Sequence, residues 1–102
     1  MTNMAAIKRD HVVQAVFECD RLGTPVFLRE YGFRTSQGYD LVHEGRDYPS
    51  KAIVGVAHRY ATGKLASSRS FDGGKRGAAR ILRDLGFTVT DPTDDAVALT
   101  ET

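Results

Sequence analysis

Residues 39–57, YDLVHEGRDYPSKAIVGVA, change from a strand pattern to a helix pattern and so decide the fold class. Side chains from Tyr39 to Glu44 alternate between two faces, as they do in a strand. Glu44 and Gly45 form a turn signal, which predicts that residues 39–43 and 46–48 pair as a β-hairpin. A helix with a stop at Gly63 is predicted next, and its inward face is expected to carry Ile53, Val56, Ala57 and Tyr60.

Two helices are predicted on the N-terminal side of this hairpin. The first covers residues 7–23, IKRDHVVQAVFECDRLG, with an inward stripe of Val12, Val13, Val16 and Phe17. Cys19 lies in the same apolar pattern and is expected in the core. The second covers residues 24–32, TPVFLREYG, with a proline at the start and a glycine at the end. Helices this close in sequence form a helical hairpin.

On the C-terminal side, residues 73–86, GGKRGAARILRDLG, predict a last helix, with Ala78, Ile81, Leu82 and Leu85 inward. Residues 87–90, FTVT, are a possible third strand, and residues 91–102 are expected to be an acidic tail or linker toward downstream domains absent from this chain. The predicted architecture is therefore one α+β domain over residues 1–90: a helical hairpin, a small antiparallel β-hairpin with that possible third strand, and two further helices.

Length and composition exclude several classes of protein. The chain has 102 residues, 41% of them hydrophobic and 26% charged, which is ordinary for a soluble globular domain. No apolar run is long enough to span a membrane, and a single cysteine allows no internal disulfide, so a cytoplasmic setting is expected. The three histidines lie at no metal-ligand spacing. We therefore expect neither metal nor cofactor, and a domain that is not itself an enzyme.

Charge is unevenly distributed along the chain. Residues 51–83 hold eight Lys/Arg and one acid, Asp72, whereas residues 84–102 hold five acids and no base. A basic block in a nearly neutral protein indicates a polyanionic partner. The alternative is a solvated face that balances the acidic tail.

Two predicted helix starts, YPSKAI and FDGGKRG, carry the candidate binding site. A helix start offers free N–H groups and a positive dipole end, and glycines let backbone approach a phosphate closely. The second stretch is not a Walker A loop, because Arg76 stands where Ser or Thr is required. The residues expected to neutralise phosphates are Lys51, Arg59, Arg69, Lys75, Arg76 and Arg80, with His58 extending this surface. The expected hydrogen-bond donors are Ser50, Gly73 and Gly74, and the candidate for contacting a base is Tyr48.

The same stretches resemble a known family. Residues 15–33, 39–57 and 71–89 are similar to the N-terminal head domain of ScoMcrA-like HNH endonucleases, which are type IV restriction enzymes that attack modified DNA. The resemblance covers about residues 7–90, and the positions that match are Tyr39, Tyr48, Ser50, Lys51, Phe71, Gly73, Gly74, Leu85, Gly86 and Phe87. In such proteins one further domain recognises phosphorothioate DNA, a second recognises 5-methylcytosine, and the HNH domain cleaves the DNA.

The resemblance and the basic block together predict a function. We expect non-catalytic binding of double-stranded DNA, including modified DNA such as that containing 5-methylcytosine, within a type IV restriction endonuclease. The competing hypothesis is a protein–protein module that docks onto downstream domains of the same enzyme or joins two copies of it.

Overall fold

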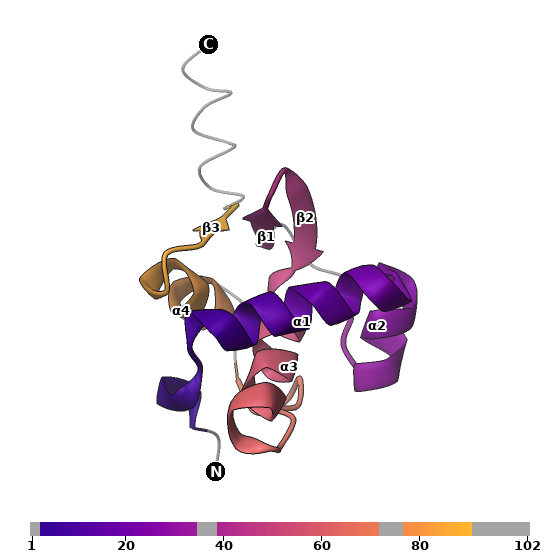
Figure 1. The fold of residues 1–102 in the computed structure, drawn as a ribbon. Helices are drawn as coiled ribbons and strands as arrows, with labels where there is room; N and C mark the ends of the chain where they lie inside the picture. Colours follow the sequence, from indigo (N-terminus) through magenta and orange to yellow (C-terminus); the bar gives the residue numbers. More distant parts are fainter. Residues whose placement is uncertain (1–2, 35–38, 72–76, 91–102) are drawn as a thin grey trace.

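The computed structural model describes residues 3–34, 39–71 and 77–90 (Figure 1). Within these ranges the elements are η1 (Met4–Ala6), α1 (Arg9–Leu22), α2 (Thr24–Tyr31), β1 (Asp40–His43), β2 (Arg46–Pro49), α3 (Ser50–Thr62), α4 (Ala78–Asp84) and β3 (Thr88–Val89). The predicted α+β class, helical hairpin, β-hairpin and third strand are all confirmed.

The three strands form one antiparallel sheet in the order β2-β1-β3. Leu41 at the centre of β1 pairs with Tyr48 on one side and with Val89 on the other. The two turn residues between β1 and β2 both have positive φ, 51° for Glu44 and 77° for Gly45. Positive φ at both positions is the geometry of a type I′ turn, which matches the twist of a tight hairpin.

α3 is the central helix of the domain. Every residue from Ala52 to His58 is buried, and α1 crosses in front of α3 while α4 lies beside it (Figure 1). Gly55 allows a close approach at this centre, because a Cβ there would lie 2.4 Å from Cζ of Phe33 and 2.6 Å from the carbonyl oxygen of Ala66. The middle of α3 is therefore packed on all sides.

The inward face of α1 differs from the prediction. Val12 and Val16 are buried as expected, but Phe17 is 74% exposed and Val13 is 37% exposed. The remaining inward positions are filled by Ala15, Glu18 and Cys19. Val13 and Phe17 are four residues apart, like Val12 and Val16, and the two pairs lie on neighbouring columns of the helix. The fold buries the column of Val12 and Val16, which lies beside the small side chains of Ala15 and Cys19.

A buried carboxylate joins α1, α2 and α3. Glu18 accepts hydrogen bonds from the hydroxyl of Tyr31 on α2 and, at 2.5 Å, from the hydroxyl of Tyr60 on α3. Tyr60 was predicted to face inward, but it is 37% exposed. Its hydroxyl nevertheless makes the hydrogen bond to Glu18. Burial alone would raise the pKa of Glu18, but the two tyrosine hydrogen bonds and the nearby charges of Arg59 and Arg21 outweigh it and lower the pKa.

Candidate nucleic-acid interface

Lys51 and Phe71 lie together at the start of α3. Lys51 is half-buried in the first turn, and its Nζ lies 5.6 Å from the centroid of the Phe71 ring. The ring of Phe71 lies in turn 6.4 Å from that of Phe33, so Phe71 packs onto the core with Lys51 over it. This contact places Phe71, the first residue of FDGGKRG, beside the first turn of α3. The predicted contact residues Gly73, Gly74, Lys75 and Arg76 lie outside the described residues.

Tyr48 and Ser50 already have partners within the fold. Tyr48 is 5% exposed, and its hydroxyl donates a hydrogen bond of 2.8 Å to the carboxylate of Asp20 on α1. Burial and this hydrogen bond raise the pKa of Tyr48. Ser50 is 2% exposed and donates its hydroxyl to the carbonyl oxygen of Tyr39 at 2.5 Å. A base contact by Tyr48 therefore requires the ring to leave this position.

Arg59, Arg69 and Arg80 are all exposed. Arg59 is in the last turn of α3, about 12 Å along the helix axis from Lys51 at 1.5 Å per residue. Lys51 and Arg59 therefore lie at opposite ends of α3. Arg80 on α4 lies 3.8 Å from Asp84, and both side chains are about 70% exposed, so this ion pair holds Arg80 only weakly.

His58 does not extend this surface, contrary to the prediction. It is 4% exposed, and its Nε2 accepts a hydrogen bond of 3.1 Å from the backbone N–H of Asn3. The other ring nitrogen, Nδ1, lies 2.6 Å from the carbonyl oxygen of Lys64. With Nε2 as an acceptor, the neutral tautomer carries its proton on Nδ1 and donates it to this carbonyl. His58 thus holds the N-terminal segment at Asn3 and the segment after α3 at Lys64.

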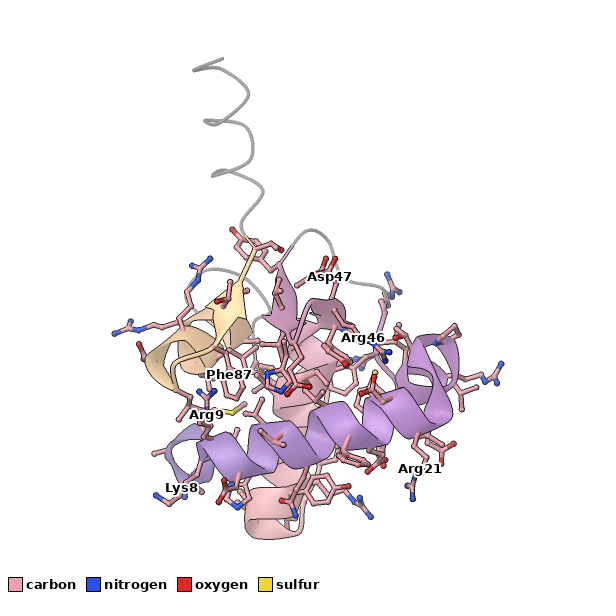
Figure 2. All side chains as sticks on the ribbon, turned by 45° about the horizontal axis from the view of Figure 1, so that its top comes forward. Lys8, Arg9, Arg21, Arg46, Asp47 and Phe87 are labelled. Carbon is pink, nitrogen blue, oxygen red and sulfur yellow. The ribbon has the colours of Figure 1, made fainter. Side chains whose placement is uncertain are left out.

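The structure also holds a cation that the charge pattern of the sequence does not single out. Arg9 at the start of α1 donates a hydrogen bond of 3.0 Å from Nη1 to the carbonyl oxygen of Leu85, and its guanidinium lies 4.2 Å from the centroid of the Phe87 ring (Figure 2). Gly86 has φ of +92°, and a Cβ there would lie 3.1 Å from that same Nη1. Leu85, Gly86 and Phe87 thus form the contact site of Arg9, which lies near the other end of the sequence.

The contact with Arg9 gives a physical reason for the Leu85–Gly86–Phe87 motif, which is one of those that carry the resemblance. The carbonyl of Leu85, the missing side chain of Gly86 and the ring of Phe87 each contact or leave room for Arg9. The ring of His43 makes a T-shaped contact with the ring of Phe87, with 5.8 Å between the two ring centroids. Charge counting along the sequence misses Arg9 because the first 50 residues hold more acids than bases.

The described residues contain no cluster of three or more His, Cys, Asp or Glu arranged to hold a metal ion. None of the described helices is long and apolar enough to span a membrane.

Residues 5–91 match the protein family described as ScoMcrA-like, N-terminal head domain. The chain belongs to this family. A comparison of this head domain with curated proteins finds no match. Among known structures, it is similar to the type IV phosphorothioation-dependent restriction endonuclease ScoMcrA, with 36% sequence identity and a TM-score of 0.62. That similarity covers 83% of the head-domain chain and 13% of the ScoMcrA chain.

Proposed function

We propose that this head domain binds double-stranded DNA without catalysis, as part of a type IV restriction endonuclease. The observation that carries the proposal is the 36% identity with a restriction endonuclease over most of this chain. The basic block of residues 51–83 supports it independently, because eight cations against one acid favour a polyanionic partner. Residues 91–102 would then lead toward further domains of such an enzyme.

The contact surface that we propose begins at the first turn of α3 and continues along the basic segment to α4. Lys51 supplies a cation there, and its contact with Phe71 limits its rotamers, so less conformational entropy is lost when it meets a phosphate. The sequence places Lys75 and Arg76 four and five residues after Phe71, and Arg80 follows on α4. Backbone contacts of this kind position a protein on DNA and carry no base information.

Fluorescence anisotropy with salt titration tests this proposal. Otherwise identical duplexes that are unmodified, 5-methylcytosine-modified or phosphorothioated would be compared. Lys75→Glu should weaken binding to all three duplexes and reduce the slope of log K against log salt by about one or more, because a phosphate contact is lost. The matched control is Arg29→Glu, an equal charge reversal at an exposed position on α2.

Three outcomes are informative. Equal loss with both variants would indicate only a net-charge effect and contradict the proposed surface. A preference for one modified duplex that persists at higher salt would add a reading function, and Tyr48→Phe would then test whether the Tyr48 hydroxyl takes part. Absence of binding to every duplex at low salt would refute the DNA proposal and leave docking onto other domains as the function.

A further inference from the structure

α1 carries a second, unused face. Phe17 is 74% exposed, the highest value among the exposed large apolar side chains of the described residues, and Val13 one turn earlier is 37% exposed. Their spacing of four residues places them on the same side of the helix. In both views α1 crosses the front of the molecule and no other described element covers it (Figure 1, Figure 2).

Opposite charges stand at the two ends of this face. Asp10 lies in the first turn of α1 and Arg21 in the last, at spacings that continue the column of Val13 and Phe17. Both charged side chains are exposed, and neither forms an ion pair within the described parts of the chain. The stripe therefore reads acid, apolar, apolar, base over about 16 Å of helix.

Such a stripe is complementary to itself when it runs antiparallel. Turning a second copy by 180° places Asp10 of one copy opposite Arg21 of the other at both ends of the contact. Phe17 of each copy then meets Val13 and Gln14 of the other at the centre. A two-fold contact of this kind is isologous, because the same patch is used on both sides and the assembly closes at two copies.

We infer that two copies of this domain associate through the outer face of α1, packed antiparallel. Both helix dipoles are also antiparallel in this arrangement, which adds to the pairing of opposite charges. Two apolar side chains per copy make a small contact, so the dimer is weak, with a Kd on the order of 100 µM. The inference does not depend on DNA binding, since none of the proposed phosphate contacts lies on α1.

Mixing two charge-reversal variants of the whole chain tests the arrangement. Asp10→Arg leaves two bases at the ends of the stripe and Arg21→Asp leaves two acids, so like charges meet in each variant's own dimer and each variant alone should be monomeric. In an equal mixture, a base of one variant faces an acid of the other at both ends of the contact, so association should return. Sedimentation equilibrium from about 10 µM to about 1 mM measures this, and circular dichroism checks that each variant is folded.

Phe17→Ala and Val26→Ala form the second test. Phe17→Ala should raise the Kd at least about tenfold, which corresponds to removal of a central apolar contact. Val26, on α2, is also exposed at 37% but lies off the stripe, so Val26→Ala should leave the Kd unchanged. A monomeric wild type up to about 1 mM would overturn the inference. A mixture of the two charge variants that stays monomeric would overturn it as well.

Discussion

Replacing Gly55 by alanine should destabilise the domain, although alanine is the better helix former. In an exposed helix interior this change stabilises by about 1 kcal/mol. Gly55, however, lies in the middle of α3, and a Cβ there would be 2.4 Å from Cζ of Phe33 and 2.6 Å from the carbonyl oxygen of Ala66. Both distances are far below ordinary van der Waals contact, so something must move.

Neither neighbour can move freely. The ring of Phe33 is 7% exposed and packs against Phe71. The carbonyl of Ala66 is backbone, and the N–H of the same residue donates to the carbonyl of Gly55 at 3.2 Å. Overpacking costs about 1–3 kcal/mol and a lost hydrogen bond about 1 kcal/mol. Set against the gain in helix propensity, the net loss in the free energy of unfolding is about 1–3 kcal/mol.

Urea unfolding followed by circular dichroism measures this loss. The midpoint should fall for Gly55→Ala with an unchanged m-value, because the surface exposed on unfolding stays the same. Phe33→Leu removes the distal ring atoms, so a double-mutant cycle should show coupling between the two positions. A Gly55→Ala protein as stable as the wild type, or more stable, would refute this account of the packing.

Three further predictions concern contacts between distant elements. Glu18→Gln should destabilise at neutral pH. Since folding lowers the pKa of Glu18 below its ordinary 4.5, this contribution is present above that pH and is lost as pH falls through the folded pKa. Urea midpoints of the two proteins should therefore converge in acid, and a constant gap would contradict this role of the carboxylate. Burial, followed by the hydrogen bond to Glu18, raises the pKa of Tyr31 to about 12, so the absorbance change on its ionisation should appear near that pH. In Glu18→Gln the pKa of Tyr31 should fall toward the ordinary value of 10, and an unchanged pKa would count against the contact. Arg9→Ala should cost about 1–2 kcal/mol through lost contacts with Leu85 and Phe87, and Arg9→Lys should not fully restore it, because lysine lacks the planar guanidinium. Full restoration by lysine would mean that charge alone matters.

Local sequence patterns predicted the order of elements because each signal here is short-range. The turn at Glu44 and Gly45 needs positive φ at both residues, and alternation around it identifies the two strands. Periodicity failed on α1, where Val12 with Val16 and Val13 with Phe17 are equally good apolar pairs. Only the approach of α3 decides between them, and that is a tertiary effect.

The candidate site was less predictable, since the partners of its residues are distant in sequence. Tyr48 finds Asp20, which lies 28 residues away, and Ser50 finds the carbonyl of Tyr39. His58 finds Asn3, 55 residues away. Polar residues at helix starts and in basic stretches are consistent with both binding and internal support, and only the fold separates these roles.

The buried thiol of Cys19 makes the helical hairpin accessible to kinetic measurement. It is the single cysteine of the chain, it is 1% exposed, and its Sγ lies 3.7 Å from Oγ1 of Thr24 where α1 passes into α2. Burial raises the pKa of this thiol, so little of the reactive thiolate is present until the junction between α1 and α2 opens. The rate of labelling by a disulfide reagent therefore reports how often α2 leaves α1, residue-specifically and without an engineered probe.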